Sequence, residues 1–201
     1  MKEALKYNVL PLDDRFVERS DPAVAGRPDL MEGRKSLTLY AGMTGMMENT
    51  FVNVKGRSLT ITAEVEIPQG GANGVILAQG GRFGGWSLYL KDGKPAYVYN
   101  WTGLAHDTVA ASEPAPAGKA TITLDFAYDG GGRGKGGTAT LSVNGKKVAE
   151  GRIKKTNATM FSMDEGADVG MDDDTPVTEE YAAGMKSRFT GKIDKVTVDL
   201  K

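Results

Sequence analysis

The chain has 201 residues, a formal net charge of −1 at pH 7 and no cysteine. This length can bury the core of one ordinary domain, and the lack of cysteine excludes disulfides, thiolate metal sites and cysteine nucleophiles. A zinc site built on several imidazoles is excluded too, because His106 is the one histidine. With no excess of positive charge and no apolar run of 18 residues, we expect neither nucleic acid nor a membrane as a partner.

Residues 1–35 are predicted to form an arm that precedes the folded domain. Lys2–Tyr7 are helix formers by propensity, but they are too few for a stable helix, and Pro11 ends any helical stretch. The stretch DPAVAGRPDLMEGR has two prolines and two glycines and neither helical nor strand periodicity. No secretion signal is visible at the N-terminus, so a cytoplasmic location is the default expectation.

Strand patterns begin at Ser36 and continue to the C-terminus, which defines a predicted domain over residues 36–201. SLTLYAG alternates, and SLTITAEVEI shows period 2 over nine residues, with a wet face that carries Thr60, Thr62, Glu64 and Glu66. VILAQ is a short apolar run, as expected of a strand covered on both sides. Alternating residues recur in TITLDFAY, TATLSV and KIDKVTVDL.

Two dipeptides predict tight hairpins between neighbouring strands. Asp92-Gly93 lies between GWSLYLK and KPAYVYNW, and Asn144-Gly145 lies between TATLSV and KKVAEG. Such pairs suit two-residue turns, because both central residues must reach positive φ. About nine to eleven strands and almost no helix predict an all-β fold of two packed antiparallel sheets, a β-sandwich.

Aromatic residues on one predicted hairpin, and on the loop after it, form the first candidate ligand site. Aromatic rings near a strand end can stack on sugars, and polar neighbours can supply hydrogen bonds. By alternation, Tyr97, Tyr99 and Trp101 share one face of their strand, and this face could equally be the core between the sheets or a docking surface. The candidate ligand-binding residues are Arg82, Trp86, Tyr97, Tyr99, Asn100, Trp101 and His106.

An acidic loop, DEGADVGMDDD over Asp164–Asp174, forms a candidate metal site. Carboxylate oxygens in a turning loop can bind Ca²⁺, although the spacing does not fit an EF-hand loop, and a solvated acidic loop is the alternative. The candidate ligands of a structural calcium ion are Asp164, Asp168, Asp172 and Asp174.

Two further patterns carry weaker functional signals. GRGKGG over Gly132–Gly137 matches the dinucleotide fingerprint in letters, but it lies between two strands and no helix follows, which favours a plain loop. Glu64 and Glu66 are paired acids on a strand, as in some glycosidases, yet the sandwich glucanases carry three acids in a Glu-x-Asp-x-x-Glu pattern. Solvated glutamates on the outer face are therefore the expected interpretation.

Several phrases of the sequence together resemble the C-terminal region of large bacterial arylsulfatases. The phrases are YNVLPLDDR, AGRPDLMEGR, GGRFGGWSLYLKDGKPAYVYN, FAYDGGGRGKGG and FSMDEGADVGMDDDTPVTEEY, and they span nearly the whole chain in order. The resemblance implies a concanavalin A-like or laminin-G-like jelly roll that follows a catalytic domain. It also implies that the opening residues are the arm between the two domains. The family's Cys/Ser-x-Pro-x-Arg motif, which becomes formylglycine, does not occur here, so catalysis by this chain alone is not expected.

The resemblance favours a non-catalytic accessory domain that packs against a sulfatase catalytic domain, in cis or in trans, or that self-associates. Val9, Leu10 and Leu12 of the arm would then need a partner surface. The alternative is a stand-alone lectin-like module that binds a neutral or sulfated glycan. A remnant or excised domain without an independent role is a third possibility that the sequence leaves open.

Overall fold

The computed structural model describes residues 1–7, 30–181 and 184–201 in two compact units, Met1–Glu32 and Gly33–Lys201. The first unit contains the short helix α1, Lys2–Lys6, on which Leu5 is exposed, and Tyr7 directly after it is exposed as well. The predicted arm residues Val9, Leu10 and Leu12 lie outside the described residues. No helix in the described ranges is long and apolar enough to cross a membrane.

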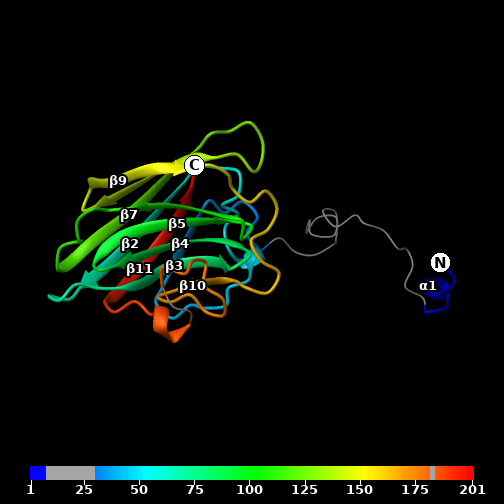
Figure 1. Cartoon of the computed structure of the whole chain (residues 1–201), viewed down its shortest axis with the longest axis horizontal. Helices are drawn as coiled ribbons and strands as arrows, with labels where there is room; N and C mark the ends of the chain where they lie inside the picture. Colours follow the sequence, from blue (N-terminus) through cyan, green and yellow to red (C-terminus); the bar gives the residue numbers. More distant parts are fainter. Residues whose placement is uncertain (8–29, 182–183) are drawn as a thin grey trace. The chain divides into compact units, whose positions relative to one another are not determined.

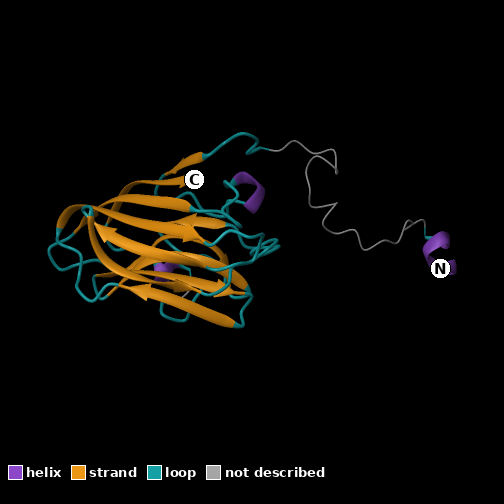
Figure 2. Cartoon of the chain, turned by 90° about the horizontal axis from the view of Figure 1, so that it is seen from above, coloured by secondary structure: helices purple, strands orange, loops and turns teal. Residues whose placement is uncertain are grey.

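The second unit is an all-β sandwich of two antiparallel sheets, as predicted (Figure 1). The larger sheet has the order β1-β11-β2-β7-β8-β9. Its strands are β1 Ser36–Leu39, β2 Leu59–Ile67, β7 Gly118–Tyr128, β8 Gly137–Val143, β9 Lys146–Ile153 and β11 Lys192–Leu200. The smaller sheet has the order β10-β3-β4-β5-β6. Its strands are β3 Gly74–Gly81, β4 Gly84–Lys91, β5 Lys94–Trp101, β6 Ala105–Ala110 and β10 Ala167–Val169, and the 3-10 helices η1 Glu48–Thr50 and η2 Met185–Ser187 lie in loops (Figure 2).

The core lies between the sheets and is built from the alternating residues that the sequence predicts. Strand β2 alternates buried and wetter positions along its length, and it pairs with β7 in an unbroken register from Leu59–Phe126 to Ile67–Gly118. Burial of these side chains is the main favourable term in folding, at roughly 1.5–3 kcal/mol for each fully buried large apolar residue.

Both predicted hairpins are present, and their turns have the backbone that the sequence requires. Asp92 and Gly93 have φ of 52° and 74°, and Asn144 and Gly145 have φ of 50° and 77°. Positive φ at both central residues gives the turn a twist that matches the flanking strands. The first turn joins β4 to β5 and the second joins β8 to β9.

The smaller sheet is buried on both faces, which positions the candidate site. Its inner face packs on the larger sheet. Its outer face is covered by residues 170–181 and 184–189, which we call the covering segment. Val177 of this segment lies in one buried cluster with Val75, Tyr89 and Val98 of the sheet, and Tyr181 packs against that cluster. The tilted edge-on rings of Tyr89 and Tyr181 are 5.1 Å apart between centroids.

Candidate functional site

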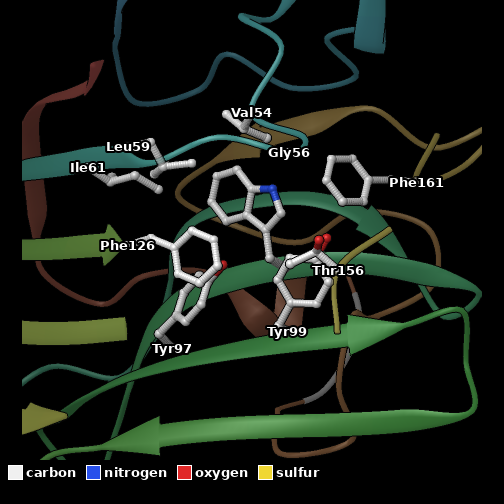
Figure 3. A pocket seen from close by; sticks show the side chains of 10 residues that line it. Val54, Gly56, Leu59, Ile61, Tyr97, Tyr99, Phe126, Thr156 and Phe161 are labelled. Atoms are coloured by element: carbon white, nitrogen blue, oxygen red, sulfur yellow. The ribbon is translucent and has the colours of Figure 1, made fainter. Parts of the chain in front are cut away.

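Three of the candidate ligand-binding aromatics belong to the core between the sheets, which is one of the alternatives that the sequence left open, so they are not ligand-binding residues on the surface. Trp86, Tyr97 and Tyr99 are 2%, 4% and 5% exposed. The alternation was assigned correctly, but the face that these residues share points at the larger sheet. With Leu59 and Phe126 of that sheet they line a small internal space, and Figure 3 shows the side chains around it, among them the labelled rings of Tyr97, Tyr99 and Phe126. These rings hold the two sheets together.

The buried tyrosines are not suited to proton transfer. Burial raises the pKa of Tyr97 well above its ordinary value, and it raises the pKa of Tyr99 in the same direction. The Tyr99 hydroxyl accepts a hydrogen bond from the backbone N–H of Asn157 at 2.8 Å. Because a phenol with a raised pKa stays neutral near pH 7, these groups act as packing and hydrogen-bonding elements.

Asn100 connects three parts of the chain at the end of the sandwich where strands β3 and β5 end. Its side chain is fully buried. The Nδ2 group lies within hydrogen-bonding distance of the carbonyl oxygens of Gly81, Arg82 and Val177, at 3.0, 2.9 and 3.1 Å. The Oδ1 atom accepts a bond from the N–H of Gly103 at 2.8 Å. Asn100 therefore fixes the β3–β4 turn, the β5–β6 turn and the covering segment, and it has no free atom for a ligand.

Exposed apolar side chains gather on these two turns. Phe83 is 73% exposed and Leu104 is 77% exposed, and Trp101 is partly exposed at the end of β5. The turns touch, since a Cβ built on Gly103 would lie 3.1 Å from the Arg82 carbonyl oxygen and within 4 Å of Phe83. We call Arg82, Phe83, Trp101, Leu104 and Lys155 the loop-end patch.

Charge is part of the loop-end patch. The Lys155 Nζ atom lies 4.5 Å from the centroid of the Trp101 ring, which is a cation–π distance. The Arg82 side chain is exposed, and its backbone N–H donates to the Thr175 hydroxyl at 3.0 Å. The sequence had indicated Arg82 and Trp101 but missed Phe83, Leu104 and Lys155, because these three show no pattern until the turns are folded together.

His106 lies on β6, outside the loop-end patch but close to Asn100. The two residues are directly paired across β5 and β6, and the His106 Nε2 atom lies 3.1 Å from the carbonyl oxygen of Val177. When Nε2 carries the proton, it donates to the same carbonyl that Asn100 contacts. His106 is exposed, and this contact helps to hold the covering segment.

Asn157 supports the loop-end patch from below and was missed by the sequence analysis. It is 2% exposed, and neither its Nδ2 nor its Oδ1 atom has a hydrogen-bond partner in the described part of the chain. A Cβ built on Gly84 would lie 2.6 Å from this Nδ2 atom, so the turn that carries Phe83 rests directly on the amide. A buried amide without partners is costly, which makes this end of the core less stable than the middle.

The four predicted calcium ligands do not converge. Asp164 and Asp174 are exposed, whereas Asp168 and Asp172 are buried. Both oxygens of Asp168 accept backbone N–H groups, from Gly45 at 2.7 Å and from Asp173 at 3.1 Å. No group of three or more acidic or histidine side chains in the described residues is arranged to hold a metal ion. This arrangement does not fit a calcium site built from all four carboxylates, and a structural calcium ion stays a prediction.

Asp172 is the most unusual acid of the loop. Its Oδ2 atom accepts a bond from the Val177 N–H at 2.9 Å and a short one from the Tyr181 hydroxyl, while Oδ1 has no partner in the described residues. The pKa of the Asp172 carboxyl is raised to about 7. Burial is the largest cause, the two hydrogen bonds oppose it, and the nearby charges of Asp168 and Glu165 add to it. The acid therefore fastens the covering segment internally.

The two weaker sequence patterns lie where structural roles explain them. The Glu64 carboxylate is 3.0 Å from the Lys195 ammonium on the outer face of the larger sheet. The glycine-rich stretch connects β7 to β8, so no helix follows it and the phosphate-binding arrangement is not formed. Tyr128 organises this loop, with its hydroxyl donating to the Gly132 carbonyl at 2.6 Å and accepting from the Lys135 N–H at 2.8 Å.

Comparisons with solved structures identify the type of sandwich. The CBM40 of Ruminococcus gnavus IT-sialidase, bound to α2,3-sialyllactose, is similar with a TM-score of 0.50 and 15% identity over 83% of this chain and 89% of that one. The same domain bound to α2,6-sialyllactose is similar with a TM-score of 0.50 and 14% identity, over 83% of this chain and 90% of that one. A leech intramolecular trans-sialidase in complex with 2,7-anhydro-Neu5Ac is similar with a TM-score of 0.50 and 12% identity, over 83% of this chain and 25% of that one.

The fold is a concanavalin A-like jelly roll. This confirms the predicted fold class of the described sandwich, and identities this low show the fold alone. No family model and no curated protein matches the sequence.

Proposed function

We propose that this chain is a non-catalytic, lectin-like module that binds carbohydrate at the loop-end patch. The observation that carries the proposal is the set of apolar side chains at two turns that Asn100 fixes together: the exposed Phe83 and Leu104 and the partly exposed Trp101. A preformed platform loses little conformational entropy on binding, and aromatic rings offer faces on which sugar C–H groups can stack.

Two other parts of the fold support this location. The inner face of the smaller sheet is filled by the core, and its outer face is covered by residues that include Val177. The loops at this end are therefore the surface through which the smaller sheet can reach a ligand. The similar R. gnavus domain is bound to sialyllactose, which supports a saccharide as the kind of ligand.

Binding of the purified chain to a panel of neutral and sulfated glycans tests the proposal. We expect saturable binding that Trp101→Ala weakens at least about ten-fold, since loss of one aromatic anchor commonly costs that much. Tyr40→Ala is the matched control, because Tyr40 is also an exposed aromatic, 56% exposed, and it follows β1 outside the patch. A folded chain that binds no glycan in the panel, or equal losses in both variants, would overturn the proposal.

An accessory role beside a sulfatase catalytic domain stays a second prediction, based on the sequence resemblance. One observation favours it: Leu5 and Tyr7 are 64% and 65% exposed, and apolar side chains at an N-terminal segment are suited to packing on another domain. A chain lacking residues 1–35 would then fail to associate with such a catalytic domain while it still folds. Equal association with and without these residues would count against the accessory role.

A further inference from the structure

Three cations beside the loop-end patch, together with Lys155 of the patch, form no ion pair within the described residues. Arg57, Arg133, Lys135 and Lys155 are exposed, and no ion pair joins them to an acid of the described chain. Their neighbours differ, since Lys55 pairs with Glu48, Arg152 with Asp129 and Lys154 with Asp107. We call the four unpaired cations the basic ridge.

The basic ridge is continuous, although its members come from three loops. A Cβ built on Gly56 would lie 3.4 Å from Arg133 Cγ, so the loop before β2 touches the glycine-rich loop. The Thr156 hydroxyl donates to the Lys135 carbonyl at 2.7 Å, which joins the glycine-rich loop to the segment after β9. Lys155 of that segment lies over the Trp101 ring. The line of contacts therefore runs from Arg57 to the aromatic side chain of the loop-end patch.

We infer that the basic ridge and Trp101 together bind an anionic saccharide, one that carries sulfate or carboxylate groups along its length. This inference rests on the proposed function and adds the chemical class of the ligand. Several unpaired cations in a row attract a chain of repeated negative charges, and the indole supplies a face for one sugar ring. The whole chain, with the ridge included, has a net charge of −1, so the attraction is limited to the ridge, which disfavours a long phosphate backbone.

The ridge also has a boundary that sets the register of the ligand. Towards Arg82 the surface carries both charges, because Arg82 and Asp174 are exposed and the Arg82 N–H is bonded to Thr175 in the same loop as Asp174. We therefore expect a negatively charged chain to lie mainly on the Lys155 side of Trp101, where the cations have no acid beside them. We expect that the charged sugar units lie over Arg133 and Lys135, with Trp101 near the end of the bound stretch.

Dextran sulfate and unsulfated dextran are the probes, since they share one sugar backbone and differ in charge. We compare the parent chain with the double variant Arg133→Ser/Lys135→Ser. Both residues lie in the glycine-rich loop, which Tyr128 holds through backbone groups and not through these two side chains. The matched control is Lys119→Ser/Lys146→Ser, which removes two cations near the start of β7 and the β8–β9 turn, at the other end of the larger sheet. Circular dichroism verifies that all three chains fold alike.

The inference predicts binding to dextran sulfate that weakens as salt rises, because exposed charges are screened. It predicts a loss of about ten-fold in the ridge variant, as expected when two exposed ion pairs are removed, and little loss in the control. Equal binding of dextran and dextran sulfate, or equal affinity of the parent and the ridge variant, would overturn the inference. The Trp101 test would still decide the proposed function by itself. Binding of single-stranded DNA as tight as that of dextran sulfate would overturn the assignment to saccharides.

Discussion

Asp172 offers a sharp test of how the covering segment is held. Its side chain is buried, and burial is the largest of the causes that raise its pKa from 3.8 to about 7. A folded-state pKa above the unfolded value means that the folded chain binds the proton more tightly. The contribution of Asp172 to the unfolding free energy is therefore fully present below about pH 4. It is lost as the pH rises towards 7, and it stays absent above that value. A pKa difference of about 3 corresponds to roughly 4 kcal/mol of unfolding free energy.

The substitution Asp172→Asn removes this titration while it keeps an oxygen for the Val177 N–H and the Tyr181 hydroxyl. The new amide nitrogen occupies the place of Oδ1, which has no partner in the described residues. Because the parent acid also has an unpaired polar atom there, we expect the two chains to differ little at low pH. We expect the variant to match the parent near pH 4.5 and to exceed it by up to roughly 4 kcal/mol at pH 8.

Urea denaturation between pH 4.5 and 8.5, followed by the fluorescence of buried Trp86, measures both chains. Asp173→Asn is the matched control, because Asp173 is an exposed acid of the same loop and its contact with Asp168 is made by the backbone N–H. A parent-to-variant difference that is constant with pH would refute the reasoning. It would mean that the Asp172 charge is compensated in the folded chain.

Three further outcomes follow from particular contacts. Asn100→Ala should lower the unfolding free energy by roughly 2–3 kcal/mol in urea denaturation, because it leaves buried carbonyl groups without a donor, and it should weaken glycan binding as the turns separate. Gly74→Ala should cost more than Gly118→Ala: φ is +99° and +94°, but only at Gly74 would the Cβ meet a backbone oxygen, that of Arg188 at 2.3 Å. If the acidic loop holds calcium, the urea midpoint at pH 8 should be higher with millimolar calcium than with EDTA, and Asp174→Asn should cancel this rise. Equal midpoints with calcium and with EDTA would exclude a structural calcium ion in this loop.

The sequence predicted the strands that alternate and the hairpins with favourable turn residues, and it failed where neither signal exists. Strand β6, Ala105–Ala110, is an edge strand whose side chains are mostly exposed, so its sequence AHDTVA shows no alternation. Strand β10 has only three residues. The covering segment has no periodicity either, since it is held by bonds such as that from Asn100 to Val177, 77 positions away.

The candidate site was predicted in part, for a reason that lies in the sheet. Alternation placed Tyr97, Tyr99 and Trp101 on one face of β5. A sequence pattern shows which face of a strand is exposed only when one face is buried and the opposite face is in solvent. Here the covering segment buries the second face, so both faces of β5 contain buried residues and the pattern could not say which was exposed. Trp101 escapes burial because it is the last residue of its strand.

The same burial on both faces determines where specificity can reside in this fold. A sheet with one open face can select a ligand with strand residues, whose positions are fixed by backbone pairing. This sheet has no such face, so selection of a ligand depends on loops. Internal hydrogen bonds must then hold these loops in one conformation. Asn100 does this for the two aromatic turns, and Thr156 does it for the glycine-rich loop through the Lys135 carbonyl. The glycine-rich loop, which carries Arg133 and Lys135 of the basic ridge, is held by a few internal hydrogen bonds that Thr156 and Tyr128 form. Changing one such bond should alter ligand affinity more than removing any one exposed charge.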